Sequence, residues 1–281
     1  MNSKDRKIGL ALGSGGMRGL AHIGVIKALC SSGFEISHIA GSSVGALIGG
    51  LYAQSGDIGQ VEEIVLGLDR KKLAGLFLDF KIGGGVVEGE KIEKFIDKCL
   101  GGVEFGQLKI AFCAVATDVK SGKLVKIKSG KVSKAIMVSG ALPVIFNPVD
   151  YMGRILIDGG VSMPVPCRVV KQMGAKFVVG VNLYCGRDYL KEKFRMYDLT
   201  FRTMAIMLSN LAVFNMKEAD YGIVADVGGW GVLDFFMERS EKEEIIRRNE
   251  KLAREKISEI KEMMKKEERG FFSDLGRLFR K

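Results

Sequence analysis

The chain has 281 residues, of which 47% are apolar, so it can bury the core of one large α/β domain or of two small ones. It has only 4 prolines and contains no Pro/Ser-rich linker, low-complexity tract or repeat of fixed period, which excludes repeat arrays and long disordered regions. The net charge of +10 fits an anionic partner, either nucleic acid or an acidic membrane surface, but an ordinary basic protein fits it equally well.

In the first part of the chain, short apolar runs typical of strands alternate with segments whose apolar residues are spaced as in helices. Gly33 would end the first helix. Residues 36–56 carry no formal charge, and this stretch is long enough to span a bilayer. Its serines and glycines favour instead a buried strand, a turn and a buried helix. The predicted elements are strands at 8–12 and 39–40 and helices at 20–29, 46–53, 58–68 and 91–100.

The second part of the chain continues this alternation. Residues 177–183 form a continuous apolar run, as buried parallel strands do. We therefore predict a three-layer α/β/α fold with a mostly parallel central sheet, over one domain from Lys7 to Met237. The predicted elements here are strands at 110–116, 124–127, 155–157 and 177–183, and a helix at 133–138.

Residues 238–281 are predicted to form a helical C-terminal extension. A charged amphipathic helix from about Glu241 to Glu268 has the pattern of a surface helix docked on the body. A short basic amphipathic segment follows, which could lie in a bilayer interface or pack on protein. Its apolar arc consists of Phe271, Phe272, Leu275, Leu278 and Phe279.

Ser43 lies in a G-x-S-x-G pentapeptide, Gly41 to Gly45, between a predicted strand and a predicted helix. The helix N-terminus after it would favour a developing anion. An α/β-hydrolase needs a histidine after its nucleophile, yet both histidines of this chain, His22 and His38, precede Ser43. A nucleophilic Ser43 therefore needs another proton acceptor. The pentapeptide alone is a weak signal, because a Gly-rich chain produces it by chance.

A Gly-rich loop from Gly13 to Gly19 follows the first predicted strand and opens the first helix. Backbone N–H groups in such a loop bind anions, either a phosphate or the oxyanion of an acyl-transfer intermediate. The dinucleotide-binding pattern G-x-G-x-x-G fits poorly, because Arg18 stands where its third glycine should be.

Asp158 ends a predicted strand and is followed by two glycines. Asp-Gly is a common turn dipeptide, so an ordinary turn is one explanation. The other is that the carboxylate accepts a proton directly from Ser43, as a two-residue catalytic unit without histidine.

Five scattered cysteines, none in C-x-x-C spacing, indicate reduced thiols in a cytosol and argue against a disulfide framework or a zinc site. No secretion signal is visible at the N-terminus. We therefore predict a cytoplasmic protein that can associate peripherally with the inner face of the membrane.

In this order, the three elements resemble the patatin-like phospholipase family over roughly residues 7–183. Leu10 to Val25 resembles the oxyanion block of the family, Gly41 to Ala46 its nucleophile block, and Gly140 to Pro166 the block that carries its aspartate. Three blocks in order are far more specific than any one of them.

The resemblance implies that Ser43 is the nucleophile and Asp158 the base of a catalytic dyad. It also implies that backbone N–H groups of Gly15, Gly16 and Arg18 bind the oxyanion, and that the reaction needs no metal or cofactor. Family members often have glycine where this chain has Ser14.

The activity that the resemblance implies is a serine acyl hydrolase cleaving carboxylic esters of phospholipids or lysophospholipids, with a lipid ester as partner and no nucleic acid. Two alternatives stay open. A membrane-associated regulatory or scaffolding protein could keep the fold with little turnover, and a nucleotide-dependent enzyme could use the first loop. The oligomeric state is not predicted.

Overall fold

The computed structural model describes residues 6–77, 89–143, 145–184, 196–232, 234 and 236–278; the side chains of residues 77, 196–198, 201 and 267–278 are outside this description. Within these residues an eight-stranded sheet has the order β5-β6-β3-β2-β1-β7-β8, with β4 paired to β3. The strands are β1 (Lys7–Leu12), β2 (Glu35–Ser42), β3 (Ala111–Asp118), β4 (Leu124–Ile127), β5 (Val149–Tyr151), β6 (Arg154–Asp158), β7 (Val178–Asn182) and β8 (Tyr221–Val224).

The pairs β1–β2, β2–β3, β1–β7 and β7–β8 are parallel, whereas β4, β5 and β6 form an antiparallel edge. The helices are α1 (Leu20–Ser31), α2 (Val44–Ser55), α3 (Ile58–Leu66), α4 (Arg70–Phe77), α5 (Glu90–Leu100), α6 (Val132–Ser139), α7 (Cys167–Gln172), α8 (Met196–Met216) and α9 (Arg239–Leu278), with short 3-10 turns η2 (Gly16–Gly19), η3 (Phe105–Gln107) and η4 (Gly159–Val161).

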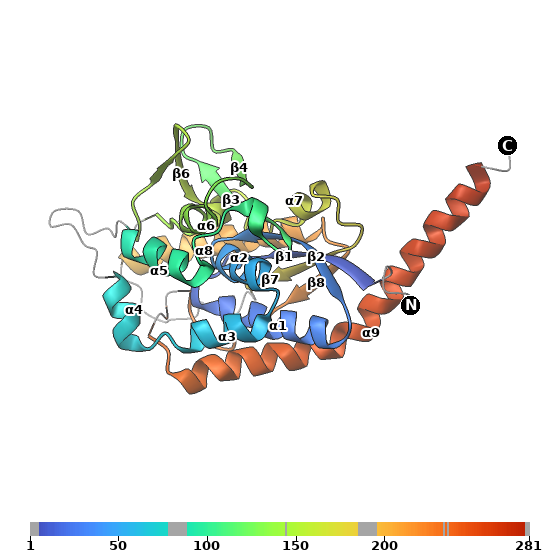
Figure 1. The fold of residues 1–281 in the computed structure, drawn as a ribbon, viewed down its shortest axis with the longest axis horizontal. Coiled ribbons are helices and arrows are strands. Elements are labelled where there is room, and N and C mark those ends of the chain that lie inside the picture. Colours follow the sequence, from blue (N-terminus) through green and yellow to red (C-terminus); the bar gives the residue numbers. More distant parts are fainter. Residues whose placement is uncertain are drawn as a thin grey trace.

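Helices cover both faces of the sheet (Figure 1). Successive strand residues point to opposite faces, so Leu10 of β1 packs in the large core beside α1 and α2, while Ala11 packs in the smaller core beneath α7 and α8. The predicted three-layer architecture with a mostly parallel sheet is therefore confirmed.

The long helix α9 runs along the outside of α1 (Figure 1). The two helices approach closely at Gly24, where an added Cβ would lie 2.2 Å from the Ile246 carbonyl oxygen. Ile245, Ala253 and Ile260 of α9 are buried in the same core as the sheet. The side chains of the predicted membrane-contact arc, Phe271 to Phe279, lie outside the described residues.

Several described elements were not predicted from the sequence, and β2 is longer than the predicted strand at 39–40. α8 is missed because its sequence from Thr203 to Met216 carries no charge, so no polar face marks its period. The unpredicted elements are α4, α7, α8, β5 and β8.

Candidate active site

The register of the sheet brings two distant segments together at one end of β3. Ser42, the last residue of β2, pairs with Val115, and the next residue of β3, Ala116, pairs with Asp158. Ser43 and Asp158 therefore flank β3 at nearly the same level. Neighbouring strands are about 4.8 Å apart, so two side chains that lean over β3 can meet.

Ser43 occupies a tight turn between β2 and α2. Its backbone angles, φ 54° and ψ −121°, lie in a region that costs a non-glycine residue about 1–3 kcal/mol. The turn folds back on itself so closely that a Cβ at Gly41 would lie 2.3 Å from the Gly45 carbonyl oxygen. The serine hydroxyl is thus presented at the N-terminus of α2, where the helix dipole favours negative charge.

Ser139, the last residue of α6, stabilises this turn through its side chain. Its Oγ accepts a hydrogen bond from the Ser43 backbone N–H at 2.9 Å and donates to the Val115 carbonyl at 2.7 Å. Ser139 is fully buried, so these bonds are made away from water. The side chain of Ser139 therefore links the strained turn before α2 to β3 through two hydrogen bonds.

Asp158 is 4% exposed, and its carboxylate accepts a hydrogen bond from the Gly160 N–H at 2.7 Å. Burial raises its pKa from 3.8 to about 6, although the nearby Ser43 hydroxyl and the Gly160 N–H both favour the charged form. Its backbone is also fixed, because its N–H donates to Ala141 and its carbonyl accepts from the Thr117 hydroxyl. The two predicted catalytic residues thus line one cavity, with the Ser43 hydroxyl near enough to the carboxylate to lower its pKa.

The Gly-rich loop lines the same cavity as Ser43 and Asp158. Among the described residues, no hydrogen bond engages the N–H groups of Gly15 and Gly16. The Arg18 N–H, in contrast, donates to the Gly15 carbonyl at 3.2 Å. Gly16 has φ 56°, and a Cβ there would lie 2.0 Å from the Val232 carbonyl oxygen, so no larger residue fits.

The segment 226–232 braces this loop. The Met17 N–H donates to the Val232 carbonyl at 3.1 Å, and Arg18 Nε donates to the Trp230 carbonyl at 2.8 Å. Arg18 is 1% exposed, so its side chain is part of the scaffold of the loop.

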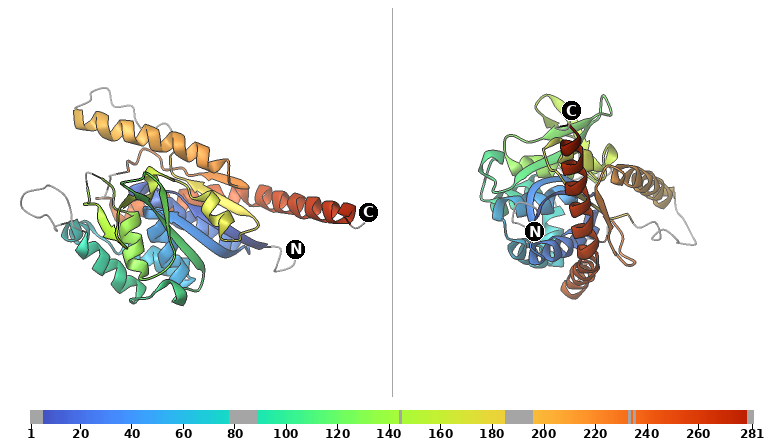
Figure 2. Two further views of the ribbon diagram at one scale, coloured as in Figure 1. Left: turned by 90° about the horizontal axis from the view of Figure 1, so that it is seen from above. Right: turned by 90° about the vertical axis from the view of Figure 1, so that its right-hand side faces the viewer.

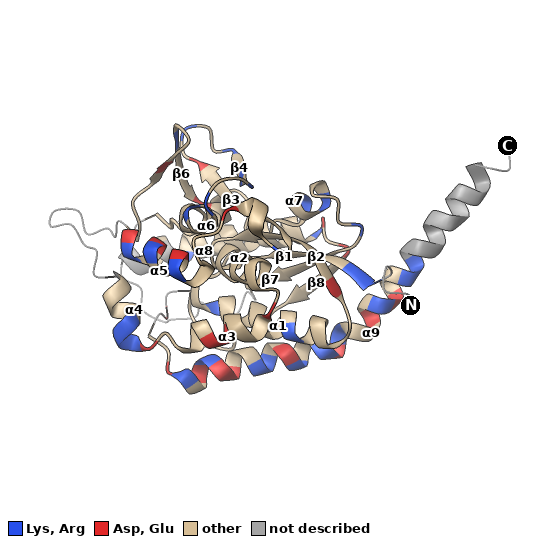
Figure 3. Ribbon diagram, viewed as in Figure 1, with Lys and Arg blue, Asp and Glu red and all other residues tan. Residues whose placement is uncertain are grey.

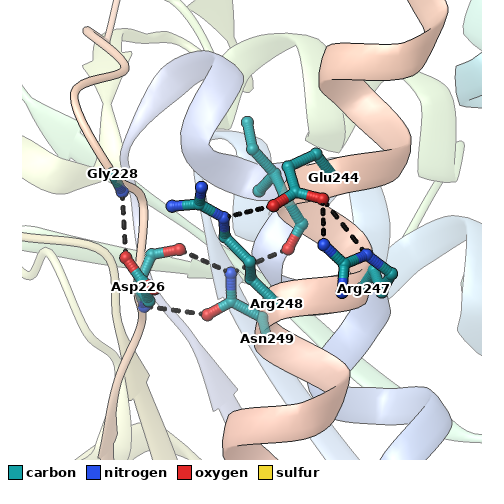
Figure 4. A network of polar contacts seen from close by, with 7 residues as sticks. Asp226, Gly228, Glu244, Arg247, Arg248 and Asn249 are labelled. Carbon is teal, nitrogen blue, oxygen red and sulfur yellow. Dashed lines mark hydrogen bonds and ion pairs between the residues drawn. The ribbon is translucent and has the colours of Figure 1, made fainter.

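Helix α9 fixes that segment in turn (Figure 4). The buried Asn249 amide pairs with the backbone of Asp226: its Oδ1 accepts from the Asp226 N–H at 2.9 Å, and its Nδ2 donates to the Asp226 carbonyl at 2.7 Å. A surface cluster of Glu244 with Arg247 and Arg248 flanks this pair. α9 is therefore connected to the Gly-rich loop through residues 226–232.

His22 lies beneath the loop on α1 and is fully buried. Its Nε2–H donates to the Gly13 carbonyl at 2.8 Å, while Nδ1 has no partner among the described residues. Burial lowers its pKa from 6.5 to about 4, so the ring is neutral at physiological pH. His22 therefore supports the loop as a neutral donor.

A cavity of about 710 Å³ opens above Ser43, a size typical of small-molecule sites. Its floor carries Ser43, Asp158 and the Gly-rich loop. A pair of buried hydroxyls, Ser14 and Tyr184, lies 3.0 Å apart in its wall. Most of the rest is apolar and comes from helices α2 to α6 and α8: Leu47, Ile48, Val65, Leu73, Leu76, Ile92, Phe95, Ile96, Ile136, Met137, Met204, Ala205 and Leu208.

A second buried cation, besides Arg18, lies in the cavity wall. Lys242 of α9 is 1% exposed, and its Nζ donates to the carbonyls of Leu68 at 2.5 Å and Val65 at 3.3 Å, at the end of α3. Burial lowers the pKa of this ammonium group. The described residues contain no group of three His, Cys, Asp or Glu side chains that could hold a metal ion.

Sequence reasoning placed Ser43, Asp158, Gly15, Gly16 and Arg18 at one site, and the structure brings all five to one cavity. It missed the residues that hold them, because their partners are close only in three dimensions. Those residues are Ser139, Val232 and Asn249. Lys242 and the Ser14–Tyr184 pair, which lie in the cavity wall, were missed for the same reason. His22 was noted on the first helix, but its bond to Gly13 has no sequence signal.

Comparison with known proteins decides the family. Residues 10–171 match the family described as patatin-like phospholipase. The chain belongs to the patatin-like phospholipase family. The resemblance seen in the three sequence blocks is therefore confirmed.

The similarity to curated relatives covers 64% of the chain. An uncharacterised NTE family protein of Mycobacterium tuberculosis is 38% identical over 181 residues, which cover 64% of this chain and 50% of that protein. Lysophospholipase NTE1 of Debaryomyces hansenii is 29% identical over 183 residues, which cover 64% of this chain and 12% of that protein. This chain thus spans about half the length of its mycobacterial relatives.

The fold also has a solved counterpart. VipD from Legionella pneumophila superposes with a TM-score of 0.55 at 14% identity, covering 92% of this chain and 67% of VipD. At that identity the likeness concerns the fold. Within the described part of the chain, no helix combines the length and the apolar character needed to cross a bilayer.

Proposed function

We propose that this patatin-like protein is a serine acyl hydrolase that cleaves carboxylic esters of lipids, with Ser43 as nucleophile and Asp158 as base. The observation that carries the proposal is the placement of the Ser43 hydroxyl beside the buried Asp158 carboxylate, in the lining of an apolar cavity. A pKa of about 6 leaves this carboxylate mostly ionised at neutral pH and basic enough to accept a proton.

The reaction proceeds through an acyl-enzyme. As Ser43 Oγ attacks the ester carbon, its proton passes to Asp158, and the tetrahedral intermediate then collapses. The leaving alkoxide departs with the proton held by Asp158. Water next attacks the acyl-enzyme and gives one proton to Asp158, which returns it to Ser43 Oγ as the free carboxylic acid is released.

The free amides of the Gly-rich loop are suited to the oxyanion of both intermediates. We assign this role to the N–H groups of Gly15 and Gly16, together with that of Val44 at the start of α2. The Arg18 N–H is already used within the loop, so we assign the Arg18 side chain to holding residues 229–232. One such donor is worth about 3–4 kcal/mol of transition-state stabilisation.

The apolar walls of the cavity suit an acyl chain, and the name of the fungal relative points to a lysophospholipid as one substrate to test. Lysophospholipid and phospholipid therefore remain the proposed substrates. Peripheral association with the inner face of a membrane through the tail, Phe271 to Phe279, also remains a proposal, since those side chains are not described.

The test is labelling by a fluorophosphonate probe, followed by peptide mapping. Wild type is expected to carry the label on Ser43, and Ser43→Ala to carry none. Ser42→Ala is a matched control, because it removes the adjacent hydroxyl from the same peptide and should be labelled like wild type.

Turnover of a p-nitrophenyl ester separates this proposal from the scaffolding alternative. Wild type and Ser42→Ala should hydrolyse it, and Ser43→Ala and Asp158→Asn should lose at least a thousand-fold in kcat. Equal rates for wild type and Ser43→Ala would contradict the hydrolase hypothesis and favour a regulatory or scaffolding protein with little turnover.

A further inference from the structure

Helix α8 has an outer face that is both apolar and exposed. Leu199, Ile206 and Val213 are spaced by seven residues, as are Met207 and Phe214, so all five lie on one side of the helix. They are 49%, 45%, 56%, 65% and 56% exposed, respectively. In Figure 2, α8 (gold) lies along the outside of the molecule, and no other described element covers this side.

An ordinary surface helix has charged side chains on its outer face, as α9 does in the same chain (Figure 3). α8 differs, because the fourteen residues from Thr203 to Met216 include no charge. Two uncharged polar residues, Thr203 and Asn210, are also exposed on this face, and the Thr203 hydroxyl donates to the Leu199 carbonyl at 2.8 Å. An exposed and largely apolar stripe of this kind marks a surface that another body covers.

The opposite face of α8 belongs to the proposed active site. Met204, Ala205 and Leu208 line the cavity above Ser43. A helix is about 10 Å across, so α8 is the only layer between its outer face and that cavity. Whatever covers the outer face therefore lies about one helix diameter from the place where substrate binds.

We propose that the outer face of α8 docks on a lipid surface. The proposal rests on the proposed function, because it gives the docked body the chemistry of the substrate. Between Thr203 and Met216 the helix carries large apolar side chains and no acidic residue, which fits the interfacial zone of a bilayer. Lys217 borders the stripe, with Nζ 5.9 Å from the centre of the Phe214 ring, and the chain as a whole carries a charge of +10, which suits anionic head groups.

Docking in this way would set the cavity beside the bilayer, so that a lipid could leave its layer next to the Ser43 site. Two other surfaces must be separated from α8 in a test. One is the C-terminal tail, and the other is the β5–β6 turn, where Met152 is 74% exposed.

The experiment is flotation of the full chain with vesicles of phosphatidylcholine, alone and mixed with phosphatidylserine. All proteins carry Ser43→Ala, so binding is measured without turnover. Met207→Glu with Phe214→Glu is expected to lower the vesicle partition coefficient at least about ten-fold. Met152→Glu makes the same chemical change at an exposed methionine elsewhere and should bind like the parent. The α8 substitutions should also lower binding in a background of Phe271→Glu with Phe272→Glu, which separates this face from the tail. Circular dichroism confirms that each variant folds, and Met207→Glu alone serves if the double variant does not.

Three results would overturn the proposal. The parent could fail to float with either vesicle, or the α8 variants could float as well as the parent. Light scattering after gel filtration could instead show a dimer that Met207→Glu dissociates, with flotation unchanged, which would assign the face to a second copy of the chain. Loss of probe labelling at Ser43 in the otherwise native chain would defeat the proposed chemistry and leave the flotation result untouched.

Discussion

The backbone N–H of Ser43 is hydrogen-bonded to the side chain of Ser139, a residue that does not face the substrate cavity. This bond joins the strained turn before α2 to the end of α6, and through Val115 to β3. The direction of the Ser43 hydroxyl therefore depends on a serine 96 residues further along the chain.

Ser139→Ala is expected to lower kcat about ten-fold or more, because the freed turn no longer holds the hydroxyl against Asp158. Removing this buried partner should also cost about 1–3 kcal/mol of unfolding free energy. Steady-state kinetics and urea denaturation measure the two effects. Ser42→Ala is the matched control, since the buried Ser42 hydroxyl has no partner among the described residues. A wild-type kcat in Ser139→Ala would show that the turn holds itself.

The backbone of Ser43 offers a second prediction. Ser43→Gly and Ser43→Ala both remove the hydroxyl, but only glycine accepts φ 54° and ψ −121° without strain. Ser43→Gly should therefore be more stable than Ser43→Ala by about 1–3 kcal/mol. Thermal and urea unfolding of the two inactive proteins measure this difference directly, and equal stabilities would mean that the turn relaxes at no cost.

The pH dependence of activity should follow Asp158. With a pKa of about 6, the carboxylate is about one-tenth ionised at pH 5, so kcat/KM should fall to about a tenth of its plateau there and rise to that plateau above pH 7. The His22 pKa of about 4 is too low to produce this limb. A profile of p-nitrophenyl ester hydrolysis from pH 5 to 8.5 tests it, and a flat profile would remove Asp158 as the base.

The catalytic candidates were predictable because each lies in a short sequence motif that can be recognised from its immediate neighbours. A serine between two glycines after a strand, and an aspartate before two glycines at the end of another, can be recognised without a fold. The supports could not be recognised in this way. Ser139, Val232 and Asn249 act through contacts that exist only after the chain has folded, and nothing in their own neighbourhoods distinguishes them.

The same limit explains why the role of the C-terminal helix was only partly predicted from the sequence. Its charged pattern predicted a docked surface helix, which α9 is over its first turns, but not that Asn249 would hold Asp226 and thereby the segment that braces the Gly-rich loop. The helix α8 was not predicted for the opposite reason: a helix that is apolar on both sides gives no amphipathic signal in the sequence.

Two buried groups at the site should act on stability in opposite directions. The pKa of Asp158 is raised in the folded protein from 3.8 to about 6, so its contribution to stability is lost as the pH rises between those values. The pKa of His22 is lowered from 6.5 to about 4, so its contribution is lost as the pH falls from 6.5 to 4. Each shift corresponds to about 3 kcal/mol, so the two effects nearly cancel between pH 4 and pH 6.

Single substitutions should separate these two contributions. Asp158→Asn removes the acid, so its unfolding free energy should fall, relative to wild type, by about 2 kcal/mol between pH 6 and pH 4, and it should exceed the wild-type value at pH 8. His22→Gln keeps an amide donor for the Gly13 carbonyl but cannot titrate, so its unfolding free energy should rise relative to wild type by a similar amount over the same interval. Urea denaturation of the three proteins at pH 4, 5, 6 and 8 measures both slopes. Since every other titrating group is common to the three proteins, parallel curves would mean that neither buried group titrates as its surroundings imply.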